Sequence, residues 1–205
     1  MLHLVLGGAR SGKSSFSEQW LQAQKEVAQQ PPFYVATAQA LDEEMQQRIA
    51  HHQQLRAASK WRLIECPLHL SKFLTGLNDK RINHPPETQY VLVDCLTLWL
   101  TNHLMVALEQ KQDDRQSSDY LAEKIAELIN ALTYASTEHL ATIVLVANEV
   151  GLGVVPLGKP SRLFVDHAGW LNQQLAKIAE QVTLVTAGIP LTLKSPKNGE
   201  VNYRG

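Results

Sequence analysis

Eight residues near the start of the sequence, GGARSGKS at positions 7–14, have the types and spacing of a phosphate-binding loop. Gly7, Gly12, Lys13 and Ser14 occupy the fixed places of the pattern G-x-x-x-x-G-K-[ST]. The glycines let backbone N–H groups turn toward phosphate oxygens, the lysine reaches the β- and γ-phosphates, and the serine hydroxyl binds Mg²⁺. We therefore expect a nucleoside triphosphate to contact Gly7, Gly8, Ala9, Arg10, Ser11, Gly12, Lys13 and Ser14.

A carboxylate follows a second apolar run, because YVLVD at positions 90–94 ends in Asp94. P-loop proteins hold Mg²⁺ with an aspartate at such a strand end, directly or through water. Asp94 and Ser14 are therefore the predicted metal ligands. An aspartate here can also cap the helix that follows, and the two roles are compatible.

A histidine between two arginines forms a third group, in DEEMQQRIAHHQQLR at positions 42–56. Arg48, His52 and Arg56 have i, i+4, i+8 spacing, which places them on one face of a helix. Cations lower the pKa of a neighbouring histidine, and a neutral imidazole beside arginines suits nucleophilic attack on a phosphate. His51 lies about 100° away around the helix. A solvated face of a surface helix explains the same residues, so the spacing alone leaves both interpretations open.

The elements that must position these groups alternate between strands and helices. The predicted strands cover 2–6, 33–37, 61–65, 90–94, 142–147, 182–188 and 190–194. The predicted helices cover 13–27, 42–58, 69–77, 96–108, 119–134 and 161–180, with an exposed loop at 110–119. This order predicts an α/β fold with a mostly parallel sheet and helices on both faces. Ligands of such sheets bind at the carboxyl ends of the strands, where each motif lies.

Bulk properties restrict the class of protein. The chain has 205 residues, of which 44% are hydrophobic, and a net charge of −1. We expect one nucleotide-binding domain over 1–194 and a polar tail over 195–205. The charge argues against nucleic-acid binding through bulk positive charge. The first residues lack the basic start and cleavage site of a signal peptide, so a cytoplasmic protein is expected.

With these residues in view, the sequence resembles the bifunctional adenosylcobinamide kinase / adenosylcobinamide-phosphate guanylyltransferase family of cobalamin biosynthesis. The resemblance extends from Leu2 to about Lys194. It rests on the segments GGARSGKS, YVATAQ, DEEMQQRIAHHQQLR, WRLIEC, VLVDCLTLWLTN and NEVGLGVVP, in this order.

The resemblance implies two reactions and a fold. ATP or GTP would phosphorylate the aminopropanol hydroxyl of adenosylcobinamide, and GMP from GTP would then be transferred to that phosphate through a GMP-histidine intermediate. The second histidine of the pair, His52, would be the nucleophile. The fold would be RecA-like, and the protein would assemble as a homotrimer. Further nucleotide contacts implied by the family are Thr37, Ala38, Gln39, Gln53, Gln54, Leu55, Arg56, Glu65 and Asp94.

Two other functions share part of this pattern. A monofunctional P-loop small-molecule kinase would keep the loop but has no use for His52 between Arg48 and Arg56. A GTP-dependent switch would carry the guanine motif N-K-x-D, whereas the candidate here reads NEVG at 148–151. We expect the glycine-rich loop that begins there to form part of the corrinoid pocket, a subunit contact, or a plain turn.

Overall fold

In the computed structural model, the described residues are 1–24, 31–39, 61–77, 88–110, 113–138 and 141–196. The strands are β1 (Leu2–Gly7), β2 (Phe33–Ala36), β3 (Arg62–Glu65), β4 (Gln89–Asp94), β5 (Ala141–Asn148), β6 (Gln181–Thr186) and β7 (Ile189–Lys194). The described helices are α1 (Lys13–Gln24), α3 (Leu70–Gly76), α4 (Leu96–Glu109), α5 (Asp114–Thr137) and α6 (Lys159–Ile178).

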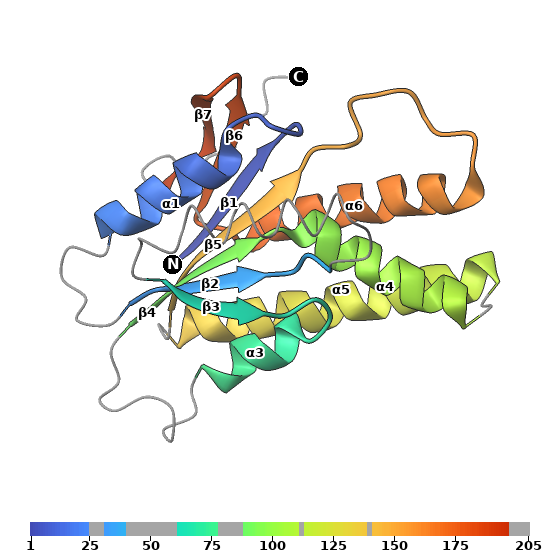
Figure 1. Ribbon diagram of the computed structural model, residues 1–205, viewed down its shortest axis with the longest axis horizontal. Coiled ribbons are helices and arrows are strands. Elements are labelled where there is room, and N and C mark those ends of the chain that lie inside the picture. Colours follow the sequence, from blue (N-terminus) through green and yellow to red (C-terminus); the bar gives the residue numbers. More distant parts are fainter. Residues whose placement is uncertain (25–30, 40–60, 78–87, 111–112, 139–140, 197–205) are drawn as a thin grey trace.

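All seven strands form one sheet, in the order β3-β2-β4-β5-β1-β6-β7 (Figure 1). Six of them run parallel, and β7 pairs antiparallel with β6 at the edge. One strand, β5, lies between β1 and β4. The predicted α/β fold with a mostly parallel sheet is confirmed.

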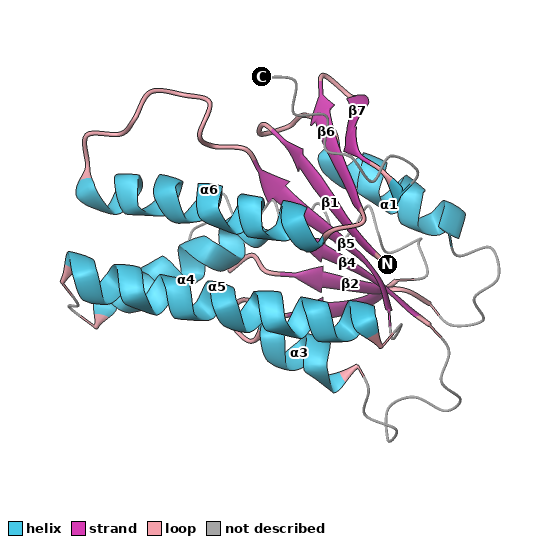
Figure 2. Cartoon of the chain, turned by 180° about the vertical axis from the view of Figure 1, so that it is seen from behind, coloured by secondary structure: helices cyan, strands magenta, loops and turns pink. Residues whose placement is uncertain are grey.

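The two faces of the sheet are covered unequally. Helix α1 lies on one face, and α3, α4, α5 and α6 lie on the other (Figures 1 and 2). Successive side chains of a strand point to opposite faces, so each central strand contributes to both cores. In β5, for example, Ile143 and Leu145 belong to the larger core on the α4–α6 face, and Val144 and Val146 to the smaller core against α1. The expectation of helices on both faces is confirmed.

The predicted exposed loop over 110–119 is partly wrong, because α5 begins at Asp114. A capping box starts the helix: Gln116 N donates to Asp113 Oδ1 at 2.7 Å, and Asp113 N donates to Gln116 Oε1 at 3.1 Å. This D-x-x-Q pattern satisfies two backbone groups that the first turn of a helix leaves without partners. The high charge of the segment is typical of an exposed helix start as well as of a loop.

The predicted strand 182–188 is too long at its end, because Ala187 and Gly188 form the turn between β6 and β7. Their φ values are 50° and 79°. A two-residue hairpin loop with both φ angles positive matches the right-handed twist of the strands that it joins. The predicted helix 42–58 and the end of the helix predicted over 13–27 lie outside the described residues.

Candidate active site

The phosphate loop follows directly from β1, whose residues are all buried. Glycine is required at Gly7, because a Cβ there would lie 2.2 Å from the carbonyl oxygen of Val185. At Gly12, where φ is 95°, a Cβ would lie 3.2 Å from Gly188 Cα. The loop is thus pressed against β6 and the turn that follows it, and these two glycines make the close approach possible.

Backbone hydrogen bonds hold the same loop in place. Gly188 N donates to Ser11 O at 2.8 Å, and Glu149 N donates to Gly7 O at 3.1 Å. The loop therefore touches the segment that follows β5 and the β6–β7 turn. The sequence analysis did not identify Gly188 as a neighbour of the phosphate loop. Its only signal in the sequence is a glycine at the end of an apolar run.

Lys13, at the start of α1, is 7% exposed. Its ammonium group donates to Gly8 O at 2.5 Å and to Ser11 Oγ at 3.5 Å, so it lies within the loop where phosphates are expected. Burial lowers the pKa of this group, and Cys95 and Asp94 act in the opposite direction. The position suits an ammonium group that neutralises phosphate charge.

The two predicted metal ligands meet. Ser14 Oγ donates to Asp94 Oδ2 at 2.9 Å, although 80 residues separate them in sequence. Tyr34 OH donates to the same carboxylate oxygen at 2.5 Å. The N-cap of α4 is Cys95, whose side chain makes no capping hydrogen bond, so the alternative prediction of Asp94 as the N-cap is wrong.

Tyr34 was missed in the choice of site residues. It is 3% exposed and packs edge-on against Trp61, and its hydroxyl reaches the end of β4 from β2. The segment YVATAQ drew attention to this stretch, but a tyrosine in a buried strand has the same pattern as a core residue. Only the pairing of β2 with β4 brings it to Asp94.

Strand register aligns further predicted contacts. Ala36 pairs with Asp94 on one side and with Glu65 on the other, so the ends of β4, β2 and β3 form a row. Glu65 is exposed at this edge, and Ala38 and Gln39 are half-buried. We call the segments 37–39 and 66–68, which follow β2 and β3, the β2 exit and the β3 exit.

Thr37 is fully buried, and its hydroxyl group is occupied by the protein. Thr37 Oγ1 donates to Cys95 O at 2.6 Å and accepts from Cys95 N at 2.9 Å. Thr37 N also donates to Asp94 O at 3.2 Å. The side chain thereby fixes the β2 exit to the residue after Asp94, a structural role that the sequence did not indicate.

The histidine group lies outside the described residues. This applies to Arg48, His51 and His52, and to the predicted nucleotide contacts Gln53, Gln54, Leu55 and Arg56. Their roles stay predictions. In the described part of the chain, no three His, Cys, Asp or Glu side chains gather as a metal site.

The loop after β5 exposes apolar side chains. Glu149 Oε1 accepts from Gly151 N at 2.9 Å, which bends its start. Beyond this bend, Leu152, Val154, Val155 and Leu157 are each at least 69% exposed. Whether the loop contributes to a corrinoid pocket or to a subunit contact stays a prediction.

A scan of protein families finds one that matches residues 3–193, described as cobinamide kinase / cobinamide phosphate guanyltransferase. The bifunctional adenosylcobalamin biosynthesis protein CobP of Pseudomonas aeruginosa is 45% identical over 194 residues, covering 95% of this chain and 98% of its own length. The proteins named CobU of Salmonella typhimurium and Escherichia coli are 40% and 38% identical, each covering 95% of this chain and 100% of its own length.

Among solved structures, the KaiC-like protein PH0186 of Pyrococcus horikoshii aligns with a TM-score of 0.40 and 16% identity, over 89% of this chain and 69% of that one. No helix among the described residues combines the length and the apolar character that crossing a membrane requires. Since the family match and the three relatives each extend over nearly the whole sequence, the chain belongs to the cobinamide kinase / cobinamide phosphate guanyltransferase family.

Proposed function

We propose that this protein phosphorylates adenosylcobinamide with ATP or GTP and then transfers GMP from GTP to the new phosphate, giving adenosylcobinamide-GDP. The observation that carries the proposal is the contact between Ser14 and Asp94 beside the phosphate loop, in a chain of this family. A nucleotide held by that loop presents two phosphorus atoms to two different nucleophiles.

In the kinase reaction, the substrate hydroxyl attacks the γ-phosphorus, and the nucleoside diphosphate leaves. In the second reaction, a ring nitrogen of His52 attacks the α-phosphorus of GTP and pyrophosphate leaves. A phosphate oxygen of adenosylcobinamide phosphate then attacks the GMP-histidine and releases the imidazole. The covalent intermediate divides one difficult transfer into two easier steps. Lys13, buried within the loop, would neutralise charge on the phosphates in both reactions.

The contact between Ser14 and Asp94 also fits Mg²⁺. A hydroxyl and a carboxylate are oxygen ligands of the kind that Mg²⁺ prefers, and Mg²⁺ in such sites takes only one or two protein ligands beside water and phosphate oxygens. When bound, the ion would neutralise phosphate charge and orient the chain of phosphates. Tyr34 would keep the Asp94 carboxylate aimed at the ion through its hydrogen bond to Oδ2.

The remaining nucleotide contacts follow the family resemblance. They are residues 7–14 in the loop, Thr37, Ala38 and Gln39 in the β2 exit, Gln53, Gln54, Leu55 and Arg56 after the histidine, Glu65, and Asp94. The position of Glu65 and the β2 exit at the same sheet edge as Asp94 supports this assignment. We further propose that the protein acts as a homotrimer in the cytoplasm and binds no nucleic acid.

The test uses GTP labelled at the α-phosphorus with Mg²⁺, followed by denaturation and measurement of protein-bound label. We expect an acid-labile, alkali-stable adduct on the wild type and on His51→Ala, and none on His52→Ala. Absence of label from the wild type would leave a monofunctional P-loop kinase as the function. If His52→Ala carries as much label as the wild type, the nucleophile is another side chain.

A further inference from the structure

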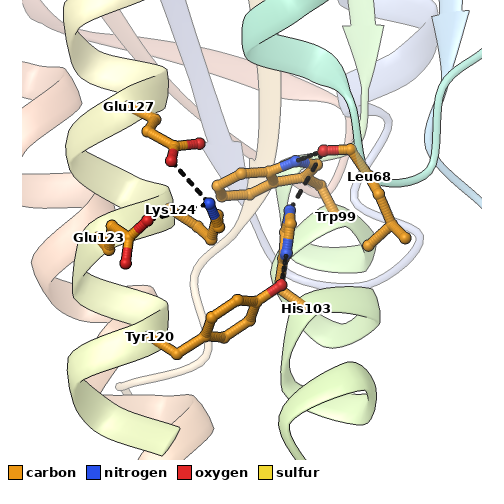
Figure 3. Close-up of polar contacts among 7 residues, drawn as sticks. All are labelled: Leu68, Trp99, His103, Tyr120, Glu123, Lys124 and Glu127. Carbon is orange, nitrogen blue, oxygen red and sulfur yellow. Dashed lines mark hydrogen bonds and ion pairs between the residues drawn. The ribbon is translucent and has the colours of Figure 1, made fainter.

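Helix α4 presents three side chains to the β2 and β3 exits. Trp99 Nε1 donates to Leu68 O at 3.3 Å, and His103 Nε2 lies 3.2 Å from the same oxygen (Figure 3). Asn102, between them in sequence, contacts one carbonyl in each exit. Residues three and four apart share a helix face, so one face of α4 holds both segments.

Asn102 joins the two exits through one amide group. Its Nδ2 atom donates to Thr37 O at 2.8 Å and to Pro67 O at 3.0 Å. Two carbonyl acceptors fix which end of the amide faces them, because only the nitrogen can donate. The side chain is 5% exposed, so it holds this position without competition from bulk water.

The location of the exits indicates which part of a ligand they face. Neighbouring strands are about 4.8 Å apart, so the β2 exit lies about 14 Å along the sheet from the end of β1. The phosphate loop is at β1, and Asp94 lies between it and the exits. A nucleoside triphosphate that is anchored at β1 and extends past Asp94 therefore brings its ribose and base toward β2 and β3.

We infer that Asn102 is a positioning residue for the nucleoside part of the nucleotide: it holds the β2 and β3 exits together so that Ala38, Gln39 and Glu65 can contact the ribose and base of GTP. The inference rests on the proposed function. Thr37 and Cys95 tie the β2 exit to β4, and Cys66 N donates to Ala36 O at 2.8 Å, but Asn102 adds the connection between the exits beyond the last paired residues.

The test compares two ligands that share the phosphate loop. Inorganic tripolyphosphate with Mg²⁺ needs only the loop, whereas GTP with Mg²⁺ also needs the exits. In Asn102→Asp, a carboxylate oxygen replaces the donor and faces two carbonyls. Calorimetric titration should show that its Kd for GTP rises about tenfold or more, while its Kd for tripolyphosphate stays within about twofold of the wild type.

Asn172→Ala is the matched control. Asn172 is also a buried asparagine on a helix, 8% exposed, and its Nδ2 atom donates to Asn148 O at 3.4 Å, at the last residue of β5. We expect its Kd for GTP to stay within about twofold of the wild type. If Asn102→Asp does not fold, Asn102→Ala lets water reach the two carbonyls and serves for the same comparison.

Several outcomes would overturn the inference. If Asn102→Asp binds GTP and tripolyphosphate more weakly by the same factor, Asn102 supports the fold alone. If its affinity for both ligands is unchanged, Asn102 does not position the exits. If the wild type forms the GMP adduct but Asn102→Asp keeps normal GTP affinity, the inference fails and the proposed function stands. A wild type that does not bind GTP would overturn both.

Discussion

The two halves of the sheet's carboxyl edge are built by different means. The phosphate loop is shaped by its backbone: glycines allow close approach to β6, and main-chain groups bind Ser11 O and Gly7 O. The β2 and β3 exits are shaped by side chains from a distant helix, above all Asn102 and Trp99. The loop tolerates no added atoms where its backbone lies against other backbone, as at Gly7, whereas exits held by side chains depend on donors and acceptors. Substitutions should therefore act differently in the two halves.

The largest effect is expected for Gly7→Ala. The new Cβ would lie 2.2 Å from Val185 O, so the loop and β6 must separate. We expect the free energy of unfolding to fall by about 3 kcal/mol or more and GTP binding to be lost. Urea denaturation and calorimetry measure the two effects.

Gly8→Ala tests whether lack of space for the new Cβ causes the destabilisation expected for Gly7→Ala. Nothing lies within 4 Å of a Cβ built on Gly8, so its free energy of unfolding should change by no more than about 0.5 kcal/mol. Equal destabilisation by the two substitutions would contradict the close-approach explanation for Gly7.

A second prediction concerns the half held by side chains, which contains a buried histidine. Burial lowers the pKa of His103 from 6.5 to about 4; the nearby Glu127 carboxylate and a hydrogen bond to Leu68 raise it, and the charges of Lys124 and His69 lower it. The unfolded chain therefore binds a proton that the folded chain excludes. The contribution of neutral His103 to the free energy of unfolding is fully present above about pH 6.5. It is lost as the pH falls toward 4, by up to about 3 kcal/mol.

Urea denaturation at several pH values, with His103→Gln for comparison, measures this loss. His3, whose pKa burial also lowers to about 4, and His167, whose pKa burial lowers as well, add to the total in both proteins. The variant should lose less stability between pH 6.5 and 4.5 than the wild type. Identical pH dependence would mean that His103 is not neutral in the folded protein.

A third prediction concerns Tyr34, which lies on β2 and contacts Asp94 between the two halves. Tyr34→Phe removes the hydroxyl that donates to Asp94 but keeps the ring against Trp61. We expect the Mg²⁺ concentration for half-maximal kinase activity to rise about tenfold or more, as for the loss of other groups that orient metal ligands. The binding of Mn²⁺, followed by electron paramagnetic resonance in the presence of nucleotide, should weaken in parallel. An unchanged metal requirement would show that Tyr34 does not orient the carboxylate.

The smallest effect is expected at the start of α5. Asp113→Ala removes the side chain that accepts from Gln116 N, which should cost about 1 kcal/mol of stability without changing GTP affinity. Thermal unfolding and calorimetry on the same sample test both statements. A change in GTP affinity would mean that α5 influences the exits through α4.

The difference between the halves also explains what could be predicted from sequence. The phosphate loop is contiguous, and its glycines, Lys13 and Ser14 have fixed spacing, so it was found at once. Asp94 followed because it ends an apolar strand. The mostly parallel sheet followed from the alternation of short apolar runs with helical periodicity.

The remaining features lack a local pattern. Tyr34 and Asn102 reach their partners across 60 and 65 residues, and each has the composition of an ordinary core or helix residue. Such contacts are determined by strand order and helix docking, which one sequence does not reveal. The capping box at Asp113 was in principle visible, but the charges around it favoured a loop.

The place of β1 in the sheet has a consequence for synthesis of the chain. Its partners, β5 and β6, begin at Ala141 and Gln181, and the turn that contacts the phosphate loop comes at Gly188. Strand β1 therefore leaves the ribosome well before the two strands that flank it in the sheet. A nascent chain shorter than about 190 residues has the whole nucleotide motif in its sequence but not the neighbours that shape it. Contacts between such distant residues also slow folding. The phosphate loop thus gains the last of these neighbours only after Gly188 has been translated.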